Sequence, residues 1–196
     1  MKVTFEQIRC KDDSYGPGAD EPYFAVLSQY LKKNAAGENK KPHVIKGPAM
    51  LSKVQYDVKS GTVYQPVMMN GANYLELKPE DADAVQLAIL MFEEDSGRKY
   101  RRMEKNISDY SNQSPDWDNI VSGVFADFPG GVSWEKWLKY ALKILIRIGQ
   151  KVAEDDNLGR RELILPLQNN HHIYGKRQLT FDGFGSNYKM FIDIEK

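Results

Sequence analysis

The residues best suited to chemistry in this chain are carboxylates concentrated in a few loops. The stretch KDDSYGPGADEPY holds Asp12, Asp13, Asp20 and Glu21 among glycines and a proline. Calcium prefers roughly six to eight oxygen ligands, carboxylates among them, so this loop would need partners from other loops. The further acidic positions are Asp57, Asp182 and the runs at 93–95 and 154–156. The stretch is therefore either an ordinary solvated turn or one side of a cation site.

Conventional catalytic groups are sparse. The adjacent His171 and His172 would point to opposite faces of a strand, and His43 is distant in sequence. Cys10 is the only cysteine, and its place in an alternating apolar run predicts a buried structural thiol. No nucleophile elbow, phosphate-binding Gly-Lys loop or His-Glu-x-x-His sequence is present. The chain therefore leans away from an enzyme.

Composition limits the class of protein. The 196 residues include 27 basic and 27 acidic side chains, and this zero net charge argues against a dedicated nucleic-acid binder. An apolar content of 41% with three tryptophans can build the core of a single domain, residues 1–196. No signal-like or membrane-spanning run is present, so a cytoplasmic location is the default prediction. Export without a classical signal is the alternative.

Short apolar runs separated by turn signals dominate both ends of the chain. PYFAVLSQYL follows the acidic loop, and AVQLAILMF is apolar almost throughout, as in a strand buried on both faces. We expect a hairpin within 50–69 and a closing hairpin that turns at 182–186. Residues 97–154 have helical signals instead. The expected fold is mainly β, an antiparallel β-sandwich with a helical insertion between two late strands.

Three helices are expected in this insertion. GRKYRRMEKNISDY is strongly charged, which fits a surface helix or a mobile segment. Ser114 and the following proline start a helix over PDWDNIVSGVFADF. Ser133 caps the longest helix, WEKWLKYALKILIRIGQKVAED.

This longest helix is amphipathic. Its apolar residues form one stripe at helical spacing, and basic residues recur on the other face. A cationic helix with tryptophans fits an interfacial membrane binder. It fits equally well a helix packed on the sheet with its lysines in water, which is the arrangement we favour. The candidate residues for membrane or partner contact are Trp134, Trp137, Lys136, Lys139, Lys143 and Arg147.

Four segments of the β portions resemble a known family. They are IRCKDDSYGPGADEPYFAV, LAILMFEEDSG, EDDNLGRRELILPL and LTFDGFGSNYKMFIDI, and together they resemble the calcium- and phospholipid-binding β-sandwich domains of the protein kinase C type. In that family an acidic pair and an Asp-Asp-x-x-Gly segment lie close together, whereas here the helical region separates them. The resemblance implies calcium as a cofactor, with the candidate ligands Asp12, Asp13, Asp20, Glu21, Glu94, Asp95, Asp155 and Asp156.

Convergence of these carboxylates depends on strand direction. If every expected strand alternates in direction, the loop at 11–21 and the junction at 93–161 lie at opposite ends of the sandwich. One miscounted strand would place them at the same end.

These observations predict a non-enzymatic binding module that contacts a membrane surface or a protein partner. Its binding would depend on calcium if the acidic loops converge. The alternative is a metal-independent interaction or assembly protein whose acidic loops serve only solubility. A carboxylate-based hydrolase is the third possibility, because glycoside hydrolysis needs only two acids at a fixed separation.

Overall fold

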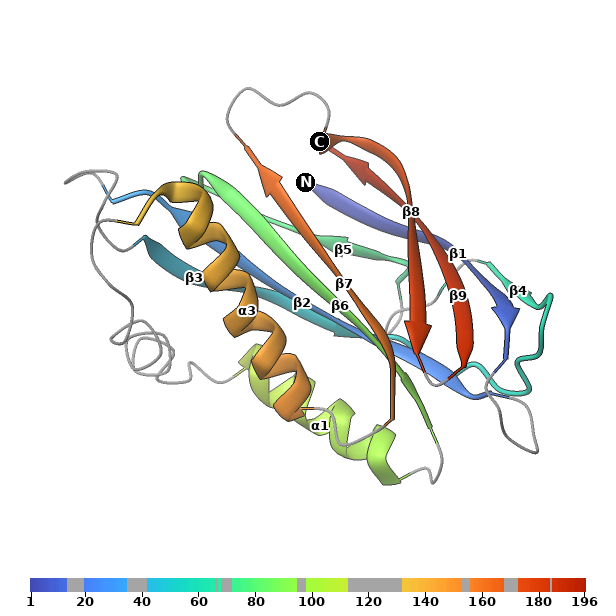
Figure 1. The fold of residues 1–196 in the computed structure, drawn as a ribbon. Helices are drawn as coiled ribbons and strands as arrows, with labels where there is room; N and C mark the ends of the chain where they lie inside the picture. The colour runs from blue at the N-terminus through green and yellow to red at the C-terminus, as the bar shows by residue number, and fades with distance from the viewer. Residues whose placement is uncertain are drawn as a thin grey trace.

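The protein is a β-sandwich covered on one side by helices (Figure 1). The computed structural model describes residues 1–13, 20–34, 42–65, 67, 72–94, 98–112, 132–152, 156–167, 173–183 and 185–196. One antiparallel sheet, called here the polar sheet, has the strand order β4-β1-β9-β8, with β5 also paired to β1. The other, called here the covered sheet, has the order β3-β2-β6-β7.

The bounds of the described elements follow the chain. The first half contains β1 (Lys2–Asp12), β2 (Pro22–Lys32), β3 (His43–Leu51), β4 (Val63–Tyr64), β5 (Tyr74–Glu76) and β6 (Ala84–Glu93). The second half contains α1 (Arg98–Asn112), α3 (Trp134–Val152), β7 (Asp156–Pro166), β8 (Gly175–Gly183) and β9 (Ser186–Glu195).

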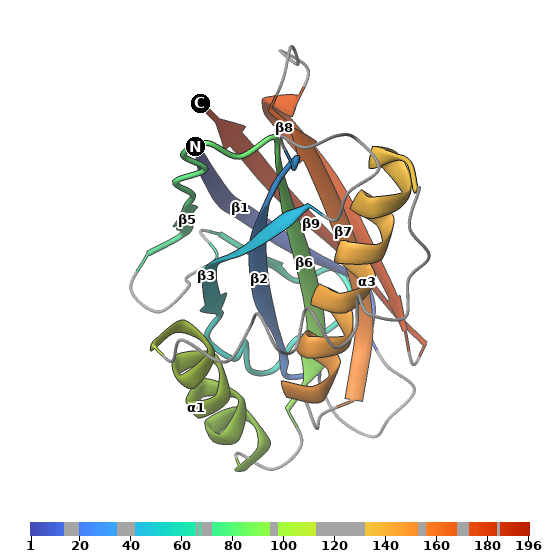
Figure 2. The same ribbon diagram turned by 90° about the vertical axis from the view of Figure 1, so that its left-hand side faces the viewer.

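The expected fold class is confirmed. Helices α1 and α3 lie in the chain between β6 and β7, which are neighbours in the covered sheet. Both helices lie on the same side of the sandwich, with α3 packed on β2 and β6 and α1 packed on β3 (Figure 2). The helix expected over PDWDNIVSGVFADF falls within 113–131, outside the described residues.

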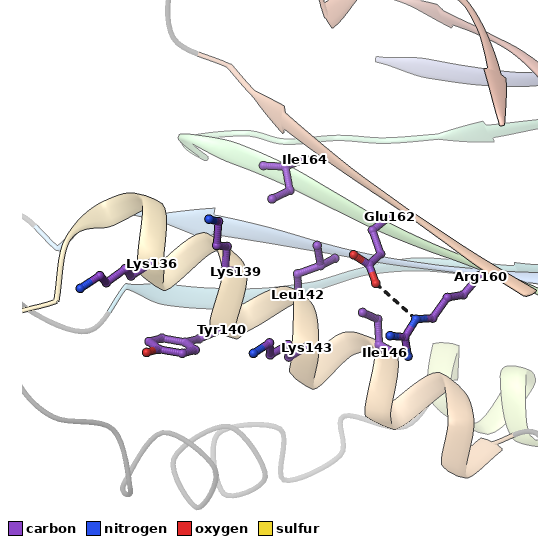
Figure 3. A pocket seen from close by; sticks show the side chains of 9 residues that line it. All are labelled: Lys136, Lys139, Tyr140, Leu142, Lys143, Ile146, Arg160, Glu162 and Ile164. Atoms are coloured by element: carbon purple, nitrogen blue, oxygen red, sulfur yellow. Dashed lines mark ion pairs between the residues drawn. The ribbon is translucent and has the colours of Figure 1, made fainter. Parts of the chain in front are cut away.

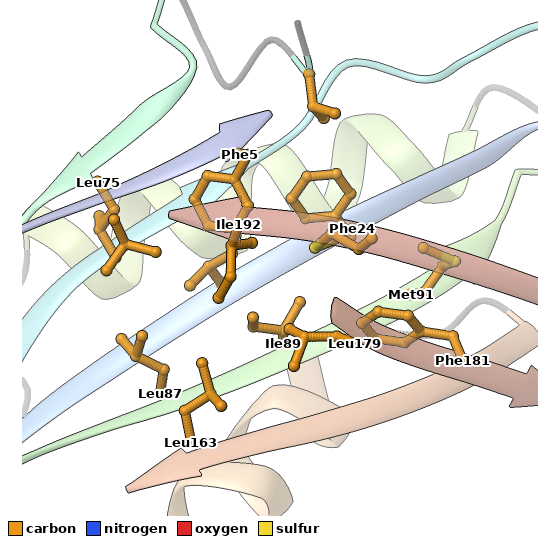
Figure 4. Close-up of a cluster of buried hydrophobic side chains, with 14 of the residues drawn as sticks. Phe5, Phe24, Leu75, Leu87, Ile89, Met91, Leu163, Leu179, Phe181 and Ile192 are labelled. Carbon is orange, nitrogen blue, oxygen red and sulfur yellow. The ribbon is translucent and has the colours of Figure 1, made fainter. Parts of the chain in front are cut away.

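Strand β6 is buried on both faces, as its apolar run predicts. Leu87 and Ile89 lie in the core between the two sheets (Figure 4), and Val85 belongs to the same core. Leu90 and Phe92 belong instead to the core beneath the helices. Burial of a side chain of this size stabilises the fold by about 1.5–3 kcal/mol. Because β6 contributes to both cores, it connects the three layers.

One face of the polar sheet is exposed to solvent. Along β9 burial alternates, with Tyr188, Met190 and Ile192 inside and the intervening residues half-buried. On the outer face, Lys176 forms an ion pair with Glu6 at 2.7 Å, and both side chains remain partly in water. This sheet therefore needs no covering layer.

The prediction of a hairpin within 50–69 is wrong. Strand β4 pairs with β1 through Ile8 and Arg9, and Val58 forms an isolated bridge with Asp20. Strands β4 and β5 both run antiparallel to β1, β4 near its end and β5 near its start. Together they take the place of a single strand beside β1 in the polar sheet. Counting them as two strands of opposite direction therefore reverses the expected direction of every later strand.

The closing hairpin is confirmed, since Gly183 pairs with Ser186 at its turn. Lys2 pairs with Glu195, so the two termini lie side by side (Figure 1). The loops rich in carboxylates lie at the opposite end of the sandwich.

Candidate functional site

The acidic loops meet at one end of the sandwich, called here the acidic end. Strand β1 ends at Asp12, β6 ends at Glu93 and β7 begins at Asp156. The strand register pairs Glu93 with Pro22 on one side and with Asp156 on the other. The loop after β1 and the junction after β6 therefore lie at the same end of the sandwich, because β4 and β5 run in the same direction and together replace one strand.

Within the acidic end, Asp20 is a structural residue. It is 1% exposed, and the Tyr188 hydroxyl donates a hydrogen bond to its Oδ2 at 2.5 Å. Its backbone exchanges two hydrogen bonds with Val58, with N to O distances of 2.9 and 3.0 Å. Buried carboxylates require such donors. Asp20 thus holds the start of β2 against β9 and against the segment that precedes β4.

Cys10 lies beside the same tyrosine. Burial raises the pKa of its thiol from 9.0 to about 11, although the hydrogen bond with the Tyr188 side chain acts in the opposite direction. Burial also raises the pKa of Tyr188, and its hydrogen bond to Asp20 raises it further. Both groups are protonated at neutral pH, and the expected buried thiol is confirmed by its 1% exposure.

Two further carboxylates bind groups of the protein itself. The Ser60 hydroxyl donates a hydrogen bond to Asp13 Oδ1 at 2.6 Å and is the main reason why the pKa of Asp13 is lowered. Glu94 is 4% exposed and accepts a hydrogen bond from the backbone N–H of Tyr100 at 2.6 Å. Tyr100 lies in the first turn of α1, where N–H groups lack partners within the helix, so Glu94 caps that helix.

The expected calcium ligands are thus only partly assembled. Asp12 is exposed and Glu21 is half-buried, while Asp95 and Asp155 lie outside the described residues. Asp156 is placed as a strand residue, and its side chain is not described. Among the described residues, no group of three or more histidine, cysteine, aspartate or glutamate side chains could hold a metal ion.

The apolar stripe of α3 packs on the covered sheet. Trp137, Ala141 and Leu145 are at most 1% exposed, as in the packed arrangement favoured from the sequence. Trp137 must therefore be removed from the expected membrane or partner contacts, because the covered sheet already buries it. Trp134 is half-buried, and the Lys33 ammonium lies 5.3 Å from the centre of its ring. The side chain of Arg147 is not described.

Two buried glutamines attach α3 to the sheet. The Gln29 amide donates hydrogen bonds to Gln86 Oε1 at 2.7 Å and to the Ala141 carbonyl at 2.8 Å. The Gln86 amide donates to the Leu138 carbonyl at 2.6 Å. These directional bonds fix the position of the helix along β2 and β6, which apolar packing alone would specify less tightly.

A cleft opens between α3 and the outer face of β7 (Figure 3). Because α3 packs mainly on β2 and β6, the neighbouring edge strand β7 keeps part of its outer face uncovered. The cleft has a volume of about 770 Å³, within the range of roughly 300–1,000 Å³ usual for ligand sites. The described residues that line it are Lys136, Lys139, Tyr140, Leu142, Lys143, Ile146, Arg160, Glu162 and Ile164.

The charge of this cationic cleft is unbalanced. Its lining has four cationic side chains and one carboxylate, and Arg160 pairs with Glu162 at 3.5 Å. Lys136, Lys139 and Lys143 are exposed, and no ion pair joins them to a carboxylate in the part of the chain that the structure describes. The cleft therefore presents positive charge to water above an apolar floor.

Sequence reasoning found the helix side of this cleft and missed the strand side. Arg160, Glu162 and Ile164 alternate with the buried Leu163 and Leu165, so they share the outer face of β7. RELIL indicates a strand, but its outward-facing residues and the covering of that face depend on where α3 lies, which the local pattern does not contain.

None of the described helices is long and apolar enough to cross a membrane. No protein-family model matches the chain, and a search of curated proteins finds no match. The geometry of the acidic end and of the cationic cleft is therefore the basis for any function assigned to this chain.

Proposed function

We propose that this chain is a non-enzymatic binding module whose cationic cleft binds an anionic partner. The observation that carries the proposal is the concentration of Lys136, Lys139, Lys143 and Arg160 around one open cleft with a single carboxylate in its lining. Functional binding sites are usually concave, apolar in part and equipped with a few polar groups that set specificity. An anionic group is the chemical complement of this lining.

The positions of the lysines support this proposal energetically. Lys139 and Lys143 are four residues apart on α3, where like charges are neighbours and destabilise a helix by about 0.2–0.5 kcal/mol. Glu135, four residues before Lys139, offsets part of this repulsion, but neither lysine forms an ion pair with a carboxylate among the described residues. A bound anion would compensate it, and the attraction would also accelerate association at low ionic strength.

The mode of contact differs from membrane insertion. An interfacial helix inserts its apolar face among lipid chains, but here that face packs on the covered sheet, with Trp137 and Leu145 buried. The lysines alone remain to meet an anionic surface. The partner is therefore recognised by charge, either on a protein or on a membrane surface.

The test is binding to two anionic probes, a polyglutamate peptide and vesicles containing phosphatidylserine. The variant Lys139→Glu/Lys143→Glu should weaken binding about tenfold or more, and added salt should weaken binding by the wild type. The matched control is Arg101→Glu/Lys105→Glu, which makes the same charge change on exposed positions of α1. Equal losses in both variants, or the absence of any anionic probe whose binding depends on Lys139 and Lys143, would contradict the proposal.

A second candidate function is calcium binding at the acidic end. The observation that favours it is the strand register that brings Glu93 beside both Pro22 and Asp156, so that three acidic loops share one end. The test is a thermal melt of chelator-stripped protein titrated with calcium and, separately, with magnesium. A calcium site occupied at about 100 times its dissociation constant would add roughly 2.7 kcal/mol of stability.

The variant for this test should be Asp12→Asn, because Asp12 is exposed and we expect its replacement to change stability little. Replacing Asp20 would destabilise the protein through the lost Tyr188 hydrogen bond and so would confuse the result. A calcium-specific rise in melting temperature that Asp12→Asn reduces supports a site at this end. No rise at millimolar calcium rejects it.

A further inference from the structure

We infer that the anionic partner of the cationic cleft is an acidic segment of another protein in which carboxylate and apolar side chains alternate. This inference rests on the proposed function and adds the chemical class of the ligand. It follows from the spacing of the cations, the apolar floor between them and the position of Glu162.

The cations are spread along the cleft. Lys136, Lys139 and Lys143 occupy one side of α3, and a rise of about 1.5 Å per residue separates the first from the last by roughly 10 Å along the helix axis. A single compact anion, such as a phosphate, would be held by cations that converge on one point. A ligand for these lysines instead needs several negative charges in a row.

An extended peptide matches this spacing. Lys139 and Lys143 are one helical turn apart, about 6 Å along the axis. In an extended chain, side chains on the same face recur every second residue, about 6.6 Å apart. Carboxylates at alternate positions of a peptide can therefore meet successive lysines, while the intervening side chains point elsewhere.

The intervening positions would face apolar surface. Leu142 and Ile146 on α3 and Ile164 on β7 belong to the lining of the cleft (Figure 3). Leu142 and Ile146 are 6% and 5% exposed, and Ile164 is half-buried, so they form a floor below the lysines. Apolar side chains of a ligand would make binding more favourable by covering this floor. A purely acidic peptide would leave it exposed to water.

Glu162 discriminates against a dense polyanion. Its carboxylate lies within the lining and holds Arg160 at 3.5 Å, so one of the four cations is already partly neutralised. A nucleic acid or a highly charged lipid surface would bring negative charge against Glu162. A peptide can place a neutral residue there, because its charges occur only where its sequence supplies them.

A membrane is the less suitable anionic partner. The apolar residues of this site lie in the floor of a concave cleft, whereas peripheral proteins insert protruding apolar side chains into a bilayer. The lysines of α3 could approach a flat surface, but Leu142, Ile146 and Ile164 would then remain uncovered. A peptide segment that enters the cleft contacts the lysines and also covers these apolar side chains.

The experiment measures fluorescence anisotropy of a labelled peptide in which glutamate and leucine alternate. Its comparison probes are the same peptide with glutamine in place of glutamate, a polyglutamate peptide of equal charge, and phosphatidylserine vesicles. The alternating peptide should bind most tightly. Lys139→Glu/Lys143→Glu should weaken it about tenfold, and Arg101→Glu/Lys105→Glu should not.

Two single variants separate the contribution of charge to binding from the contribution of the apolar floor. Ile164→Ser should weaken the alternating peptide severalfold and leave polyglutamate binding unchanged. Glu162→Gln should strengthen binding of the alternating peptide about threefold by releasing Arg160 from its ion pair, a gain that damage to the fold cannot mimic. Melting temperatures of all variants show whether each one is folded.

The outcomes distinguish this inference from the proposed function. If vesicles or polyglutamate bind through Lys139 and Lys143 but the alternating peptide binds no better than its glutamine counterpart, anion binding by the cationic cleft stands and the acidic segment is rejected. If no anionic probe depends on the two lysines, both conclusions are overturned. Preferential, lysine-dependent binding of the alternating peptide, strengthened in Glu162→Gln, supports both.

Discussion

The acidic end and the cationic cleft use their charges in opposite ways. At the acidic end, Asp20 and Glu94 are buried and accept hydrogen bonds from Tyr188 and Tyr100. In the cleft, Lys139 and its neighbouring lysines on α3 are exposed and form no ion pair within the described residues. The carboxylates therefore hold the fold together, whereas the lysines remain available for a partner.

The comparison shows that a cluster of charge in sequence does not identify a binding site. Asp13, Asp20 and Glu94 are candidate ligands by residue type, but each forms a hydrogen bond with a group of the protein itself. Each of these carboxylates therefore already stabilises a contact within the fold. The comparison predicts that variants of the acidic end lower stability and that variants of the cleft lower affinity.

The largest effect on stability is expected for Asp20→Ala. The substitution leaves the buried Tyr188 hydroxyl without its charged acceptor, and hydrogen bonds to charged groups contribute about 1.5–3 kcal/mol. The free energy of unfolding, measured in urea, should fall by about 2–3 kcal/mol. Asp12→Ala is the matched control, because Asp12 is exposed, and should change stability by less than about 0.5 kcal/mol. Equal effects of both variants would contradict a structural role for Asp20.

A smaller loss is expected at alkaline pH. The pKa of Cys10 rises from 9.0 to about 11 in the folded protein because its thiol is buried. Such a group contributes stability below its unfolded pKa and loses that contribution as pH rises through the folded value. The free energy of unfolding should therefore decline between about pH 9 and 11, and less steeply in Cys10→Ala. Identical slopes in the two proteins would show that Cys10 contributes nothing to this decline.

An effect of about 1 kcal/mol is expected for Glu94→Ala, which removes the side-chain acceptor at the start of α1. Urea unfolding gives the stability, and amide hydrogen exchange of Tyr100 reports the lost bond directly. Glu104→Ala is the control, since Glu104 lies on an exposed position of the same helix. Unchanged exchange at Tyr100 in Glu94→Ala would remove Glu94 from the capping role.

The smallest effect on stability is expected for the cleft variant. Lys139→Glu/Lys143→Glu should change the free energy of unfolding by less than about 0.5 kcal/mol, because both side chains are exposed. The same variant should lose most of its affinity for acidic probes. A large loss of stability here would mean that the lysines, like the carboxylates, serve the fold.

Much of the fold could be predicted from local patterns. The apolar run of β6 predicted burial on both faces, and the turn signal at 182–186 predicted the closing hairpin of β8 and β9. Ser133 marked the start of α3, and its carbonyl accepts a hydrogen bond from the backbone N–H of Trp137 at 3.0 Å. These features depend on neighbours in sequence, so the sequence contains them.

The errors involved contacts between distant residues. The segment around Val58 and β4 looked like a hairpin, but Val58 bridges to Asp20 and β4 pairs with β1. Gln29 and Gln86 interrupted apolar runs, a signal of buried polar partners, but the backbone carbonyls of α3 that accept their bonds depend on the tertiary packing. The strand side of the cleft was missed for the same reason.

The most direct test of the central claim is mapping of backbone amide chemical shifts by NMR during titration with the alternating glutamate–leucine peptide. We expect shifts on α3 between Lys136 and Ile146 and on β7 between Arg160 and Ile164, with little change at Asp20 or Tyr188. Shifts confined to the acidic end or to the polar sheet, with the cleft unchanged, would contradict it.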